Sequence, residues 1–165
     1  IVDSLVGSEM CIRDRVYMEL ASFLSQAQIQ ELAAVISKAE LLTSGEIRLH
    51  LEEKCTIDTQ VRAVEVFEAL GMEQTNLRNG ILIYISYGDQ KLALCGDKGI
   101  HQNLSKRFWT SLGNGLRRAF KNQDYFKGIS NTIMECGRQL RVHFPYQHDD
   151  INELENHVTF KEDLT

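Results

Sequence analysis

The sequence predicts one α/β domain, a three-layer α/β/α sandwich around a small mixed four-stranded sheet. Four segments with apolar residues at helical spacing are interleaved with short segments that have strand patterns. One of these, Ile-Leu-Ile-Tyr-Ile at 81–85, is a continuous apolar run typical of a central strand that is covered on both faces. At 165 residues the chain is long enough for one core of ordinary size.

Two different spacings of apolar residues predict the first helix and the first strand. Ser25 and Gln28 have capping-box spacing, and the apolar stripe that follows predicts an amphipathic helix to about Leu42. Over 46–52, apolar and polar residues then alternate. This period of two predicts a strand with one buried face.

A helix and a hairpin come next. The helix begins after Asp58 or Thr59 and ends at Gly71. The hairpin spans 81–95, with a tight turn at 87–90 that is too short for a crossover helix, so its strands are expected to be antiparallel.

Two further helices complete the predicted domain. Apolar residues share one face over 108–120 and again over 126–140, and Pro145 stops the second helix. The polar, acidic segment after it contains an alternating pattern at 157–160 that predicts an edge strand.

Composition excludes several classes of function. A net charge of −5 and scattered basic residues argue against nucleic acid as a partner. There is no apolar run long enough to insert into a membrane and no signal-peptide pattern at the start of the sequence, so we expect a cytoplasmic protein. The four cysteines lie far apart and indicate neither disulfides nor a zinc site.

Residues 1–17 are expected to be extraneous or disordered, with the single domain at 18–165. The segment has no periodicity that continues into the first helix, and Ser-Glu-Met-Cys-Ile-Arg-Asp-Arg at 8–15 resembles translated sequencing-adapter sequence. Met18 would make a natural start.

The first candidate cation site is the turn Gly96-Asp97-Lys98-Gly99. A hard cation needs several oxygen ligands, and a turn at a strand end supplies both carboxylates and free carbonyls. Asp97 is the candidate ligand here. The alternative is that Asp97 only caps the following helix.

The second candidate is the acidic cluster at 148–155. Its oxygen-bearing side chains are Asp149, Asp150, Asn152, Glu153 and Glu155. The spacing is not that of an EF-hand, and solvated surface is the alternative. If Ile151 and Leu154 dock on the sheet, the carboxylates between them are held close together and repel one another unless a cation binds.

Four acidic residues near the first strand form a third group: Glu46, Glu52, Glu53 and Asp58. The end of that strand is expected to lie beside either loop, which makes Glu52 a candidate ligand, and exposed charges at a strand edge are the alternative. A zincin motif, a phosphate-binding loop and a nucleophile elbow are all missing from the sequence, and no catalytic nucleophile is identifiable.

Five ordered blocks of sequence resemble the TPM-domain family over roughly residues 20–145. They are Ser44-Gly45-Glu46-Ile47-Arg48, Thr75 with Asn79-Gly80-Ile81-Leu82, Gly96-Asp97-Lys98-Gly99-Ile100, Phe108-Trp109 and Tyr125-Phe126-Lys127-Gly128-Ile129. The chain looks most like the stand-alone cytoplasmic bacterial branch, which shares the stretch from His143 to Leu154.

The resemblance implies an α/β/α sandwich, binding of divalent cations, calcium above all or else magnesium, and acid-phosphatase activity. Asp97 matches the family's acidic residue near the cation, and Asp149, Asp150 and Glu153 are carried over as ligands from a second loop. We therefore expect a calcium-responsive regulatory module. The alternatives are a metal-assisted phosphatase acting on phosphomonoesters and a scaffolding domain with an unknown protein partner.

Overall fold

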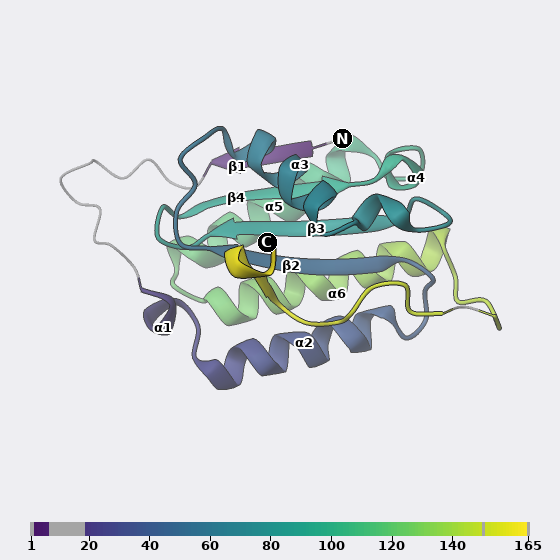
Figure 1. Cartoon of the computed structure of the whole chain (residues 1–165), viewed down its shortest axis with the longest axis horizontal. Helices are drawn as coiled ribbons and strands as arrows, with labels where there is room; N and C mark the ends of the chain where they lie inside the picture. The colour runs from purple at the N-terminus through teal and green to yellow at the C-terminus, as the bar shows by residue number, and fades with distance from the viewer. Residues whose placement is uncertain (1, 7–18, 150, 165) are drawn as a thin grey trace.

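The computed structural model describes residues 2–6, 19–149 and 151–164. Figure 1 shows a sheet between two layers of helices. The strands are β1 (Val2–Val6), β2 (Glu46–Glu52), β3 (Gly80–Ser86), β4 (Lys91–Gly96) and β5 (Thr159–Phe160). The helices are α1 (Leu20–Phe23), α2 (Gln26–Glu40), α3 (Thr59–Ala69), α4 (Lys98–His101), α5 (Lys106–Lys121) and α6 (Tyr125–His143), with 3-10 helices η2 (Met72–Gln74) and η3 (Lys161–Leu164).

The sheet has the strand order β1-β4-β3-β2-β5. The apolar strand β3 lies at its centre, as its sequence predicts. It pairs in parallel with β2 and antiparallel with β4, and β5 pairs in parallel with β2. The strands β4-β3-β2-β5 confirm the predicted mixed four-stranded sheet, including the hairpin and the edge strand near the C-terminus.

β1 adds a fifth strand that the sequence did not predict. Val2–Val6 pairs antiparallel with β4, from Val2 opposite Cys95 to Val6 opposite Lys91. For Val2–Val6 this differs from the expectation that residues 1–17 are extraneous or disordered, and the rest of that segment lies outside the described residues. The physical reason is that β4 otherwise leaves its outer backbone groups unpaired, and a short segment with β-branched ends can satisfy them.

Two separate apolar clusters hold the three layers together. On one face, side chains of α2, α5 and α6 pack against the alternate residues of β2, β3 and β4 that include Leu49, Ile83 and Leu94. On the other face, Ala63, Val66 and Phe67 of α3 pack against Tyr84 and its neighbours on β3 and β4. This arrangement confirms the predicted α/β/α sandwich.

The helix ends follow the local signals in the sequence. The Ser25 hydroxyl accepts from the Gln28 amide while the Gln28 side chain accepts from the Ser25 amide, which completes the capping box of α2. Asp58 caps α3 by accepting from two backbone amides. Gly71 follows α3 at φ 66°, a left-handed conformation that glycine adopts without steric cost.

α6 approaches both of its neighbouring helices at glycines. A Cβ at Gly137 would lie 2.7 Å from the carbonyl oxygen of Ala39 in α2, and a Cβ at Gly128 would lie 2.4 Å from the Cβ of Ala119 in α5. By contrast, a Cβ at Gly115 of α5 would meet nothing within 4 Å. The helix layer therefore requires glycine at the first two positions and not at the third.

We predict that Gly137→Ala lowers the free energy of unfolding by about 1–3 kcal/mol, because the new methyl group overpacks the α2–α6 contact. Gly115→Ala is the matched control. It adds the same methyl group to open space and should raise the free energy of unfolding by up to about 1 kcal/mol through helix propensity. Urea denaturation of both variants is the measurement, and equal effects of the two substitutions would contradict the close contact.

Candidate functional site

The side of β2 that faces away from α2 is polar and buried. Its residues are each no more than 5% exposed: Glu46, Arg48, His50 and Glu52. The C-terminal segment 151–164 runs along β2 on this side (Figure 1). Where the two meet, Glu153 contacts Glu46, a residue 107 positions earlier in the sequence. The interpretation of Glu46 and Glu52 as exposed charges at a strand edge is therefore wrong, because a segment distant in sequence covers them.

Glu52 is the most heavily bonded of these side chains. Its carboxylate accepts from Nε and Nη2 of Arg62, from the Tyr84 hydroxyl at 2.8 Å and faces Nε2 of His50 at 3.3 Å. Burial raises the pKa of Glu52, but the hydrogen bonds from His50, Arg62 and Tyr84 outweigh it and lower the pKa to about 2. All of its oxygen atoms are thus engaged by protein donors, so Glu52 fits a structural anchor better than a metal ligand.

His50 continues this network toward the C-terminal strand. Its Nδ1 lies 2.8 Å from the Thr159 hydroxyl, so carboxylate, imidazole and hydroxyl follow one another as in a hydrolase triad. Thr159 is only 1% exposed, however, and no substrate can approach its hydroxyl. The arrangement fastens β5 to β2 rather than providing a nucleophile.

Arg48 is a buried cation facing several carboxylates. Burial lowers its pKa, and the negative charges of Glu40, Glu46 and Glu155 act in the opposite direction. Its Nε has no hydrogen-bond partner among the described residues. Arg48 thus supplies fixed positive charge beneath the C-terminal segment.

Glu40, at the end of α2, bonds to a backbone amide on the side of β2 that faces away from β3. Its Oε1 accepts from the Ile47 amide at 2.6 Å. Burial raises the pKa of this carboxyl to about 8; the Ile47 bond opposes this shift and the charge on Glu46 adds to it. Glu40 is therefore largely protonated in the folded protein at neutral pH.

At the opposite end of β2 from Glu52, three chain segments form what we call the loop crossing, defined by residues 44–46, 75–79, and 147–149 with 151–153. The Glu46 carboxylate accepts from the Glu153 amide at 2.8 Å, and the Glu153 carboxylate accepts from the Asn76 amide at 3.3 Å. The Asn79 side chain donates to the carbonyl oxygen of Ser44 at 3.2 Å. Each segment is thus bonded to at least one of the others.

The loop crossing borders a cavity of about 340 Å³ that is open to solvent on one side. Its polar lining residues are Ser44, Asn76, Asn79, Gln147, Asp149 and Glu153. Asn79 is 1% exposed, and its side-chain Oδ1 has no hydrogen-bond partner among the described residues. A buried amide oxygen without a donor is costly, and a cation or a water molecule in the cavity would satisfy it.

The predicted ligands at 149–153 are distributed around this cavity. Asp149 and Glu153 line it, Asn152 lines an adjoining cavity of about 240 Å³, and Asp150 lies outside the described residues. Leu154 packs on the α3 face of the sheet as expected, whereas Ile151 is 77% exposed and does not dock on the sheet. Between Ile151 and Leu154, the Glu153 amide is held by its hydrogen bond to the Glu46 carboxylate.

Asp97 lies at the same end of the sheet, with its oxygens engaged by protein donors. Nε and Nη2 of Arg78 donate to its two oxygens at 2.7 and 2.9 Å, and the Lys98 amide donates to Oδ1 at 2.7 Å. Asp97 is the N-cap of α4, as the alternative interpretation held, and the Arg78 pair was not anticipated. Cation binding by Asp97 would require displacement of the Arg78 guanidinium.

The donor set at the loop crossing decides which metals it fits. Across the described residues, no three His, Cys, Asp or Glu side chains are grouped as a metal-holding cluster. The cavity instead combines two carboxylates with amide and hydroxyl oxygens, a set suited to a hard cation such as Ca²⁺ and unsuited to zinc.

Sequence reasoning missed five residues of these networks: Glu40, Arg48, Arg62, Asn79 and Tyr84. For Arg48 there was a signal, because a charged residue with His50 on an otherwise regular strand indicates a polar face that needs partners. Asn79 was noticed only within a block of sequence that resembles the TPM-domain family. Glu40 and Arg62 sit in ordinary helical patterns that carry no signal.

Comparisons with known proteins give one family model and two similar solved structures. A model of the TPM domain matches residues 17–139. The NMR structure of BA42 protein from the psychrophilic bacterium Bizionia argentinensis has 37% sequence identity and a TM-score of 0.79, covering 86% of this chain and 98% of that one. The N-terminal domain of cg2496 protein from Corynebacterium glutamicum, with 13% identity, a TM-score of 0.58 and coverage of 82% and 86%, shares the fold. No curated protein matched.

No helix among residues 19–149 and 151–164 has the length and apolar character needed to cross a membrane.

We predict that lowering the pH reduces the free energy of unfolding of the wild-type protein more than that of the Glu52→Gln variant. The pKa of Glu52 falls from 4.5 to about 2 on folding, so its contribution is complete above about pH 4.5 and is lost as pH falls toward 2. The wild-type advantage in free energy of unfolding, at most about 3 kcal/mol at neutral pH, should shrink over that window. Urea denaturation from pH 2.5 to 7 tests this, and parallel curves for the two proteins would contradict it.

Glu40→Gln should show the opposite dependence. The pKa of Glu40 rises from 4.5 to about 8 on folding, so the wild type loses stability as pH rises between those values. Glutamine keeps an oxygen for the Ile47 amide and does not ionise. The variant should therefore gain stability relative to wild type between pH 5 and pH 8, measured by urea denaturation, with the exposed Glu31→Gln as control. A pH-independent difference would show that Glu40 is ionised in the folded protein.

Proposed function

This chain belongs to the TPM-domain family, and we propose that it is a divalent-cation-binding module in which Ca²⁺ orders the loop crossing. The observation that carries the proposal is the buried Oδ1 of Asn79, which has no donor among the described residues and belongs to a residue that lines the 340 Å³ cavity. A cation would satisfy this oxygen without requiring a new donor from the protein.

The charges around the cavity support the same proposal. Asp149 and Glu153 line it, and Glu46 is held beside Glu153 by the backbone bond between them. Carboxylates held close together repel, and a divalent cation converts that repulsion into attraction. Arg48 offsets part of this charge from below the strand, which leaves the exposed carboxylates of Asp149 and Glu153 as the groups that gain most from an ion.

Two groups of residues would have different roles in binding the ion. Asn79 and Ser44 belong to the rigid sheet end and would fix the position of the ion, since Asn79 is already held by its bond to Ser44. Asp149 and Glu153 belong to the C-terminal segment and would close over it. Binding would therefore tie the C-terminal segment to the sheet, and this change in loop order is the regulatory output we propose.

We predict that metal-stripped protein binds Ca²⁺ with a dissociation constant between roughly 10 µM and 1 mM, since the site has few carboxylates. Calorimetry gives the affinity, and amide NMR shifts should centre on residues 76–79 and 147–153. Thermal stability should rise with calcium concentration because the ion binds only the folded state. No heat and no shifts at about 10 mM Ca²⁺ would contradict the proposal.

Single substitutions locate the site. Asp149→Asn, Glu153→Gln and Asn79→Leu should each weaken Ca²⁺ binding roughly tenfold or more, because each removes an oxygen ligand or its charge. Glu31→Gln removes an exposed carboxylate of α2, remote from the loop crossing, and should leave the affinity unchanged. Asp97→Asn distinguishes between the two candidate sites. If this variant alone loses Ca²⁺ binding, the ion binds at the α4 turn and not at the loop crossing.

A further inference from the structure

The helix hairpin α5–α6 concentrates positive charge in an acidic protein. Residues 105–143 hold eight basic and two acidic side chains, a net charge of +6, whereas the whole chain carries −5, which leaves −11 for the rest. The basic residues are Lys106, Arg107, Arg117, Arg118, Lys121, Lys127, Arg138 and Arg141. Such a separation of charge gives this face its own electrostatic field, opposite in sign to the remaining surface.

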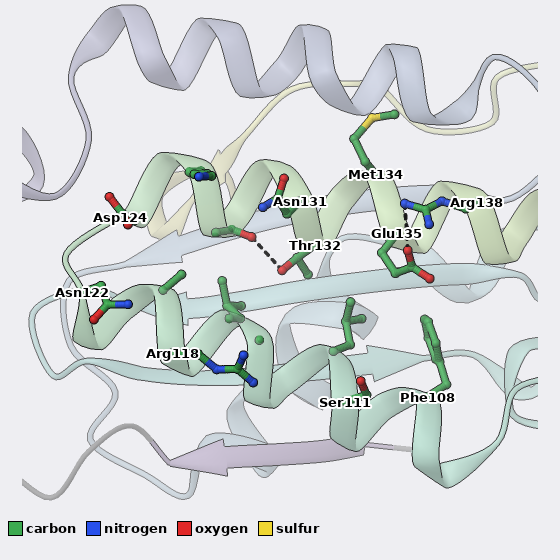
Figure 2. Close-up of a pocket in the computed structure, with 16 residues that line it drawn as sticks. Phe108, Ser111, Arg118, Asn122, Asp124, Asn131, Thr132, Met134, Glu135 and Arg138 are labelled. Atoms are coloured by element: carbon green, nitrogen blue, oxygen red, sulfur yellow. Dashed lines mark hydrogen bonds and ion pairs between the residues drawn. The ribbon is translucent and has the colours of Figure 1, made fainter.

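A groove between α5 and α6 lies within this basic face, with a volume of about 660 Å³. Figure 2 shows Arg118 and Ser111 on one wall and Asn131 and Arg138 on the other. Its apolar lining consists of the buried Leu112 and Leu116 and the partly exposed Phe108, Ala119 and Met134.

Three basic and two acidic side chains line the groove: Arg118, Lys127 and Arg138, with Asp124 and Glu135. Arg118 and Lys127 line it, are exposed, and make no ion pair with another described residue. Arg138 also lines it and pairs at 3.0 Å with Glu135, one turn before it on the same helix. An exposed pair of this kind is weak and can be exchanged for a pair with an incoming carboxylate.

Gly115 is a second and independent observation at the same place. It lies inside the exposed length of α5 and lines the groove, although a Cβ there would meet nothing within 4 Å. Glycine is, apart from proline, the least favourable residue in a helix interior. Packing inside this chain does not require it, and its effect is to keep the groove wall open.

We propose that the α5–α6 groove docks an acidic amphipathic helix of a partner protein. The apolar residues between the two helices are the kind of surface that contacts the apolar stripe of a third helix. The three basic side chains of the groove, together with the excess of basic residues on the rest of α5 and α6, complement acidic residues on either side of that stripe. Gly115 would allow the backbone of the docked helix to approach closely.

Other occupants fit the described surface less well. A nucleic acid extends beyond the groove onto surface of net charge −11, and salt screens attraction beyond about 8 Å. A membrane needs apolar side chains that project outward, whereas these line a groove. A second copy would have to donate its acidic C-terminal segment, which is packed on β2 of its own fold.

The test is to pan a phage-displayed library of random peptides, roughly 16 residues or about four helical turns long, against the full chain. The enriched peptides should be acidic, with apolar residues at i, i+3 or i+4, and i+7. The affinity of the strongest should fall roughly tenfold or more in Gly115→Leu and in Arg118→Glu, measured by fluorescence anisotropy. Gly115→Leu extends into open space, and unchanged circular dichroism should confirm its fold.

Arg107→Glu is the matched charge control, because it makes the same charge change on α5 at a residue that does not line the groove. It should change the affinity less than about twofold. Equal losses in Arg107→Glu and Arg118→Glu would overturn the proposal in favour of general attraction. Enrichment of no peptides, or of peptides without acidic residues, would also overturn it, as would a wild-type dimer that Gly115→Leu dissociates.

Discussion

The structure depends on neutralising the buried polar face of β2. Helix α3 covers β3 and β4 on that side of the sheet, and its Arg62 binds Glu52 of β2. The remainder of the cover is the C-terminal segment, which bonds to Glu46 through the amide of Glu153 and to His50 through Thr159. Burying charged groups without such partners would cost several kcal/mol each, so the segment is an integral part of the third layer.

The parts of the fold that the sequence predicts are those encoded by neighbouring residues. The capping box of Ser25 and Gln28, the left-handed Gly71 and the turn at 87–90 each act within a few positions, and the helices and hairpin they bound were found where expected. The burial of both faces of β2 could not be predicted in the same way. Alternation along a strand shows that its faces differ in polarity, but only the tertiary path of a segment 107 positions away shows that the polar face is covered.

In the candidate site, too, the features encoded by neighbouring residues could be predicted, and those that depend on the tertiary path of the chain could not. An acidic cluster at 148–155 could be expected to meet a strand end, and the structure brings Asp149 and Glu153 to a cavity there. That Asn79 would lie opposite them had no local signal. Asp97 was correctly identified as a possible helix cap, but its second partner, Arg78, is 19 positions away and adopts a φ of 52° that no sequence pattern announced.

The brevity of β5 has a consequence for how the molecule behaves in a crowded solution. β5 pairs only with His50 and Leu51, so the first half of the outer edge of β2 has no strand beside it. An open edge is a template onto which a strand of another molecule can add, which is a route to aggregation. The carboxyl of Glu40 occupies the Ile47 amide at this edge, so a side chain from α2 blocks intermolecular strand addition where the sheet itself provides no neighbour.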